Sequence, residues 1–82
     1  MEFDDLVYRY RLRVGDEVIL NGTLHTQARG GKIGKTFSNY HCYISDIRPG
    51  CTYKYLLGDD YTDELGWVDG SSLMPVTKME YL

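Results

Sequence analysis

The stretch that decides the fold is Leu65-Gly66-Trp67-Val68-Asp69-Gly70-Ser71-Ser72-Leu73. A short apolar run at 66–68 is followed by a polar turn at 69–72 and by a second apolar run at 73–76. This pattern predicts a strand, one helical turn and a last strand. Such an ending is typical of a small all-β barrel that binds a ligand and does no chemistry.

The N-terminal part alternates with a period of two between residues 6 and 14. Leu, Tyr and Val occupy one face, and Arg9, Arg11 and Arg13 occupy the other. We expect an extra strand within residues 1–13, then a barrel over 14–77 and a tail over 78–82. The arginine face is either the solvent side of an edge strand, a contact for an anionic partner, or a homodimer contact formed by strand addition.

The middle of the chain predicts several short strands and two loops. A turn at Gly15-Asp16 leads into a strand over 17–20, which Asn21-Gly22 should end as a tight turn. Residues 21–40 are rich in Gly, Thr, Asn and Ser, so we expect a long loop or irregular hairpin there. The remaining predicted features are strands at 41–47 and 52–57, a turn at Pro49-Gly50 between them, and an acidic loop at 58–64.

Length and composition indicate one small domain with aromatic residues at its surface. The chain has 82 residues and eight tyrosines, and a small core cannot supply partners for that many phenols. The net charge is −3, but the body is basic, whereas residues 59–69 carry five carboxylates and no base. We therefore expect no nucleic-acid partner, because non-specific nucleic-acid binding needs a continuous positive face.

Targeting signals and disulfides are not expected. No apolar run approaches the length of a membrane span, and Met1–Asp5 is acidic where a signal peptide is basic. We expect synthesis in the cytoplasm without a signal peptide, and no membrane partner. Cys42 and Cys51 fall too far apart along their predicted hairpin to bridge, so both should be free thiols.

Several short motifs resemble one known family when they are taken in order. They are Val14-Gly15-Asp16-Glu17-Val18, Asn21-Gly22 with Leu24, the loop Gly30–Thr36, Ser38-Asn39-Tyr40, the strand Cys42–Ile47, Tyr53-Lys54-Tyr55, and Gly66-Trp67-Val68 with Leu73. Together they resemble a bacterial SH3-like domain, and more narrowly the cell-wall-targeting module of clostridial-type phage endolysins and amidases. The resemblance implies an SH3-like barrel of five to six short antiparallel strands that docks peptidoglycan through its peptide stem or cross-bridge. The extra N-terminal strand and the long acidic loop depart from that pattern.

The resemblance also predicts where a ligand binds. A shallow groove beside the Gly-rich loop would be lined by Tyr40, Tyr53, Tyr55 and Trp67, with Asn39 and Arg29 at its rim. Flat rings pack against sugars or peptides while their polar tips reach hydrogen bonds, although Trp67 is equally well explained as a core residue. Charged residues that could contact a protein partner are Arg9, Arg11, Arg13, Asp59, Asp60, Asp63 and Glu64.

Catalytic and cofactor motifs are not expected. Gly30 and Gly34 have three residues between them, whereas a phosphate-binding loop needs four. His41 and Cys42 are adjacent in a strand and should face opposite sides, which disfavours both a metal site and a Cys–His pair. We therefore expect no metal, no cofactor and no enzymatic activity.

Two functions remain open. The first is peptidoglycan recognition by a module of a phage or prophage lysis protein, which would act at the cell wall after release. The second is a small free-standing phage-type protein that binds a host or phage protein as an inhibitor or assembly factor. In that alternative, the N-terminal strand and the acidic loop would carry the contact.

Overall fold

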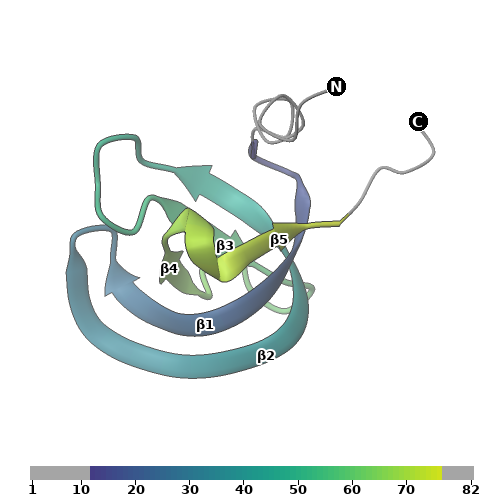
Figure 1. The fold of residues 1–82 in the computed structure, drawn as a ribbon, viewed down its shortest axis with the longest axis horizontal. Coiled ribbons are helices and arrows are strands. Elements are labelled where there is room, and N and C mark those ends of the chain that lie inside the picture. Colours follow the sequence, from purple (N-terminus) through teal and green to yellow (C-terminus); the bar gives the residue numbers. More distant parts are fainter. Residues whose placement is uncertain (1–11, 77–82) are drawn as a thin grey trace.

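A computed structural model describes residues 12–76, which form five β-strands and one turn of 3-10 helix. The elements are β1 (Glu17–Gln27), β2 (Gly30–Ile47), β3 (Tyr55–Gly58), β4 (Gly66–Val68), η1 (Gly70–Ser72) and β5 (Leu73–Pro75). They build one antiparallel sheet in the order β2-β3-β4-β1-β5, and β2 also pairs with β1. In Figure 1, β1 and β2 curve as two arcs around β3 and β4. The predicted all-β fold is confirmed as a small, partly closed barrel.

The core lies inside the curved sheet. Every second residue of β1 and of the end of β2 points inward, and β3 and β4 add one fully buried side chain each. The core residues are Val18, Leu20, Leu24, Cys42, Ile44, Leu57 and Val68. Full burial of an aliphatic side chain contributes about 1.5–3 kcal/mol. Both cysteines are free thiols, as predicted.

The largest difference from the sequence prediction is the β1–β2 hairpin. Of the two alternatives predicted for residues 21–40, the irregular hairpin is present and the loop is not: residues 21–27 and 30–40 are paired strand, and the chain turns after Gln27, not at Asn21-Gly22. The register shifts three times along this hairpin, and β2 contributes the extra residue each time. Such bulges bend a strand and increase its twist. The polar, Gly-rich composition therefore belongs to two long, bent strands.

Asn21-Gly22 has a packing role in place of the predicted turn. A Cβ at Gly22 would lie 2.6 Å from Oγ of Ser72, so the glycine lets η1 pack directly on β1. Oδ1 of Asn21 accepts the backbone N–H of Asn39 at 2.9 Å. Asn39 has a φ of 51°, a left-handed conformation that asparagine tolerates better than most residues. Tertiary packing therefore overrides the local turn preference.

The predicted N-terminal strand falls almost entirely outside the described residues. Residues 12–14 are not strand, although Leu12 packs against the core. The turn predicted at Gly15-Asp16 is present: the N–H of Asp16 donates to the carbonyl of Arg13 at 3.0 Å. The Asp16 carboxylate accepts the N–H of Arg13 at 2.9 Å. The predicted tail at 78–82 also lies outside the described residues.

The C-terminal part agrees more closely with the prediction. β4 lies at the predicted residues, and η1 and β5 lie within one residue of theirs. The strand expected at 52–57 begins only at Tyr55, because the N–H of Tyr53 donates to the carbonyl of Ala28 at 2.8 Å and holds this segment against the hairpin turn. In residues 12–76, no helix has the length and apolar character needed to cross a membrane.

Candidate functional site

A pocket of about 430 Å³ lies on the inner face of the β1–β2 hairpin. Apolar side chains from both strands form much of its wall, and Leu65 closes it from the segment before β4. Lys35 and Asp59 supply a positive and a negative charge. The full lining is Leu24, His25, Thr26, Gly34, Lys35, Phe37, Tyr40, Asp59 and Leu65.

A bulge in β2 brings two aromatic rings of this pocket together. Gly22 pairs with Phe37 and Leu20 with Tyr40, so β2 has one more residue than β1 across this interval. Phe37 and Tyr40 consequently share a face although they are three residues apart, and their ring centroids are 4.6 Å apart. A regular strand would have placed them on opposite faces.

Tyr40 is fixed by the acidic loop, which comprises residues 59–64 because Gly58 ends β3. The Tyr40 hydroxyl donates to Oδ2 of Asp59 in a short hydrogen bond. Oδ1 of Asp59 accepts the backbone N–H groups of Tyr61 and Thr62 at 2.8 and 2.9 Å. The bond to Asp59, with a contribution from burial, raises the pKa of Tyr40 to about 12. The same bond and the two N–H donors lower the pKa of Asp59.

A second tyrosine holds the same loop from the other face of β2. The Tyr43 hydroxyl lies 2.5 Å from Oδ1 of Asp63 and 3.3 Å from the carbonyl of Asp59. The bond to Asp63 is the largest cause of a raised pKa at Tyr43. Tyr40 and Tyr43 are three residues apart where the β1–β2 register is regular, so their side chains leave opposite faces. The acidic loop is therefore anchored on both sides of β2.

Gly58 allows this loop to fold back closely. A Cβ at this position would lie 3.0 Å from Cα of Asp63 and 3.0 Å from the carbonyl oxygen of Thr62. Both neighbours are backbone atoms, which cannot move aside easily. The loop that walls the pocket is therefore set by backbone packing as well as by the two tyrosines.

A second hollow, of about 370 Å³, lies beside the first and shares Tyr40 and Asp59 with it. Cys42 lines this second hollow, but burial, with a smaller contribution from Asp59, raises the pKa of its thiol to about 11. A thiol with such a pKa is protonated at neutral pH and is a poor nucleophile. His41 is exposed whereas Cys42 is buried, as the strand pattern predicts.

A different group of rings lies on the outer face of the sheet. His25 pairs with Trp67 across β1 and β4. The His25 ring stacks on Tyr53 with centroids 3.7 Å apart and an interplanar angle of 12°. The guanidinium of Arg48 lies over Trp67, 5.7 Å from the ring centroid. We call His25, Tyr53 and Trp67 the outer aromatic face, and of these three His25 also lines the pocket.

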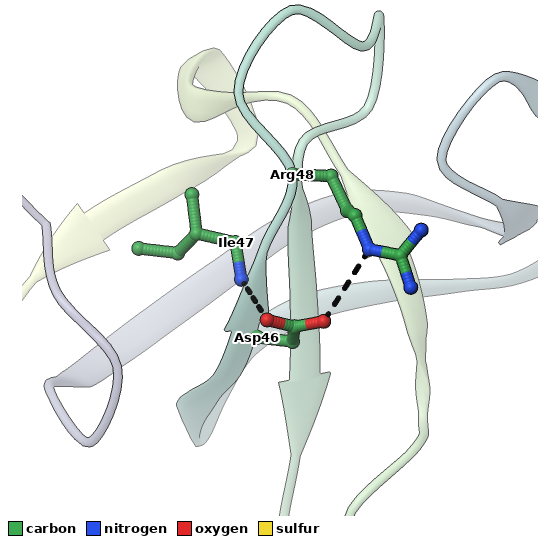
Figure 2. A network of polar contacts seen from close by, with 3 residues as sticks. All are labelled: Asp46, Ile47 and Arg48. Carbon is green, nitrogen blue, oxygen red and sulfur yellow. Dashed lines mark hydrogen bonds and ion pairs between the residues drawn. The ribbon is translucent and has the colours of Figure 1, made fainter.

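Arg48 is oriented by a carboxylate at the end of β2. Figure 2 shows Asp46 between its two partners: Oδ1 accepts the backbone N–H of Ile47 at 2.8 Å, and Oδ2 lies 3.6 Å from Nε of Arg48. Both side chains are well exposed, so the ion pair contributes little to stability. It does keep the guanidinium beside Trp67, where cation–π attraction adds to the contact.

The four aromatic residues predicted to line one groove are distributed over three places. Tyr53 and Trp67 lie together on the outer aromatic face, whereas Tyr40 lines the inner pocket. Tyr55 pairs with Val68, and its neighbour Leu56 pairs with Trp67. Since neighbouring strand residues point to opposite faces, Tyr55 and Trp67 lie on opposite sides of the sheet, and Tyr55 packs against the core. The single predicted groove is therefore not formed.

The predicted polar residues also separate. Asn39 occupies the β2 bulge, and Arg29 lies exposed in the β1–β2 turn. Of the possible partner contacts, Arg13 is exposed, whereas Arg9 and Arg11 lie outside the described residues. The acidic loop is exposed at Asp60, Asp63 and Glu64, while Asp59 is half-buried.

Phe37, His25 and Leu65 contribute to these sites although they were not predicted. Phe37 follows no alternating pattern with Tyr40, because the bulge at Asn39 intervenes. Asn39 is the one sequence feature that could have indicated this bulge, since Asn is enriched in left-handed backbone conformations. His25 lies within the segment predicted as a loop or irregular hairpin, where the sequence alone assigns it no strand partner.

The comparisons assign no family or function. Among residues 12–76, no group of His, Cys, Asp and Glu side chains could hold a metal ion. No protein-family model, curated protein or solved structure matches the chain.

Proposed function

We propose that this chain is a non-catalytic binding module whose ligand docks in the pocket of the β1–β2 hairpin. The observation that carries the proposal is the pocket itself, in which apolar and aromatic walls surround a few fixed polar groups. Such a combination is typical of ligand sites. The raised pKa of Cys42, and the exposure of His41 on the other side of the strand, support binding without catalysis.

The ligand class we propose is a short peptide segment of the bacterial cell wall. Phe37 and Tyr40 present rings against which a peptide or sugar can pack. The Asp59 carboxylate already accepts three hydrogen bonds, so Lys35 is the charged group of the pocket that is best placed to recruit a ligand. An ammonium group suits a peptide carboxylate, such as the one that ends a peptidoglycan stem. The module would then act at the wall as part of a phage or prophage lysis system.

The test is sedimentation of the chain with purified Gram-positive cell walls, followed by titration with a soluble peptidoglycan fragment that carries its stem peptide. Wild-type chain should bind both. Phe37→Ala should weaken binding by about tenfold, as expected when a central aromatic contact is lost. Ile33→Ala is the matched control, because Ile33 is an apolar residue of the same strand that is 75% exposed and lies outside the pocket lining.

Two outcomes would contradict the proposal. If neither walls nor the fragment bind wild-type chain, the ligand class is wrong. If Phe37→Ala binds as tightly as wild type while Tyr53→Ala or Trp67→Ala does not, the ligand lies on the outer aromatic face. Salt separates specific docking from charge attraction, since attraction between exposed charges is screened at high ionic strength.

A further inference from the structure

One end of the molecule is basic and aromatic, and it meets the pocket only at His25. Arg29 belongs to the β1–β2 turn, and the connection from β2 to β3 is held against that turn by the hydrogen bond from Tyr53 to Ala28. The N–H of Arg48 donates to the carbonyl of Lys54 at 2.7 Å, so these two residues close the connection. We call Arg29, Arg48 and Lys54, with the outer aromatic face beside them, the basic end.

The charges of this end are available to a partner. Arg48 is 63% exposed, and Lys54 and Arg29 are exposed as well. Within residues 12–76, the pair between Arg48 and Asp46 is the only ion pair, so Arg29 and Lys54 have no carboxylate partner in that part of the chain. Arg48 lies over Trp67 on the outer aromatic face, whereas Lys54 lies over Tyr55, whose ring is on the opposite side of the sheet. This surface is suited to an anionic partner with an aromatic or apolar contact.

The acidic loop has the complementary properties and lies at the other end of β3. Asp60 and Glu64 are exposed, and they form no ion pair with any of residues 12–76. Between them, Tyr61 is 91% exposed, the most exposed large apolar side chain of the described chain. The loop is already ordered by Tyr40 and Tyr43, so docking it loses less conformational entropy than docking a flexible loop.

We propose that the chain associates with itself head to tail, the acidic loop of one copy docking on the basic end of a second copy. Asp60 and Glu64 face the cations of the basic end, and Tyr61 supplies the apolar contact beside the outer aromatic face. The two surfaces differ, so the contact is heterologous, and repeated copies form either a closed ring or an open chain. His25 of the outer aromatic face and Asp59 of the acidic loop line the pocket, so the contact borders the pocket, while Phe37 and Lys35 belong to neither docking surface.

The experiment is sedimentation velocity of the full chain over a range of concentrations at low and at high salt. Wild-type chain should exceed its monomer mass of 9.5 kDa as concentration rises at low salt, and should return to it at high salt. Two charge-reversal variants test the surfaces: Asp60→Lys with Glu64→Lys, and Arg48→Glu with Lys54→Glu. Each alone should lower the association constant by about tenfold or more, because like charges then meet.

Mixing the two variants gives the decisive result, since each surface of one variant then complements a surface of the other. The mixture should recover association that neither variant shows alone. Tyr61→Ala should weaken wild-type association, whereas Arg13→Glu, which reverses an exposed cation outside both surfaces, should not. A 9.5 kDa monomer at every concentration in low salt would overturn the proposal. So would a mixture of folded variants that stays monomeric.

Discussion

The two connections on either side of β3 are ordered in different ways. The connection between Arg48 and Lys54 is closed by backbone hydrogen bonds, from Arg48 to Lys54 and from Cys51 to Arg48. The acidic loop also has two backbone hydrogen bonds, from Asp59 to Thr62 and from Leu65 to Leu57, but it is fixed in addition by side chains, with Asp59 and Asp63 bonded to tyrosines of β2. The shape of the first therefore depends little on pH, whereas the shape of the second depends on ionised carboxylates. Because the second forms a wall of the pocket, we expect ligand binding to share its dependence on charge.

Replacing one glycine in each connection should give the largest difference between them. Gly58→Ala forces a Cβ against two backbone atoms at 3.0 Å and should lower the free energy of unfolding by about 2 kcal/mol. Gly50→Ala meets no atom within 4 Å but must keep a φ of 87°, which should cost about 1 kcal/mol. Denaturant unfolding of both variants measures the difference. Equal stabilities would mean that the acidic loop is not closely packed.

Removal of the Tyr40 hydroxyl should change the pH dependence of stability. The folded pKa of Tyr40 is raised from 10.0 to about 12, so its contribution is fully present below pH 10 and is lost as the pH rises toward 12. The folded pKa of Asp59 is lowered, so its contribution is present above the ordinary carboxyl pKa and is lost as pH falls through the folded value. Tyr40→Phe should reduce the loss of folding stability at alkaline pH, and it should move the pKa of Asp59 back upward.

Carboxyl NMR titration of Asp59, with unfolding measured across the same pH range, tests this prediction. Tyr53→Phe is the matched control. Tyr53 stacks on His25, and within residues 12–76 its hydroxyl forms no hydrogen bond to the acidic loop. An Asp59 pKa that stays unchanged in Tyr40→Phe would contradict the assigned cause of the shift.

The smallest effect should come from the ion pair at the basic end. Asp46→Asn keeps an oxygen that accepts the Ile47 N–H but removes the charge opposite Arg48. Exposed pairs contribute little, so the free energy of unfolding should fall by no more than about 0.5 kcal/mol. Thermal unfolding at low and high salt measures the change. A loss as large as that of Gly58→Ala would contradict this account and show that the first connection depends strongly on the Asp46 charge.

The sequence predicts the C-terminal half of this fold better than the hairpin, for a physical reason. Residues 66–75 form short elements whose turn residues and apolar pattern agree with their structure, so local preference is sufficient. The β1–β2 hairpin joins residues that are far apart in the sequence, such as Leu20 and Tyr40. In addition, three bulges in β2 break the period of two. Gly22 looks like a turn residue but is needed for contact with Ser72.

The same limits apply to the candidate site. Tyr40 was identified from its residue type and neighbourhood, and it does line the pocket. Its partner Phe37 could not be placed without knowledge of the bulge. Likewise, Tyr55 and Trp67 cannot be assigned to faces until the pairing of β3 with β4 is known. The tyrosine–carboxylate bonds join residues that are 19 and 20 positions apart, which no local sequence pattern indicates.

The most direct test of a ligand site in the hairpin pocket is an NMR titration of the labelled chain with the soluble peptidoglycan fragment. We predict that the resonances of Leu24, Phe37, Tyr40 and Leu65 shift with saturation, while those of Tyr53 and Trp67 stay unchanged. Shifts confined to the outer aromatic face, or no shifts at a saturating concentration of fragment, would contradict the proposed site.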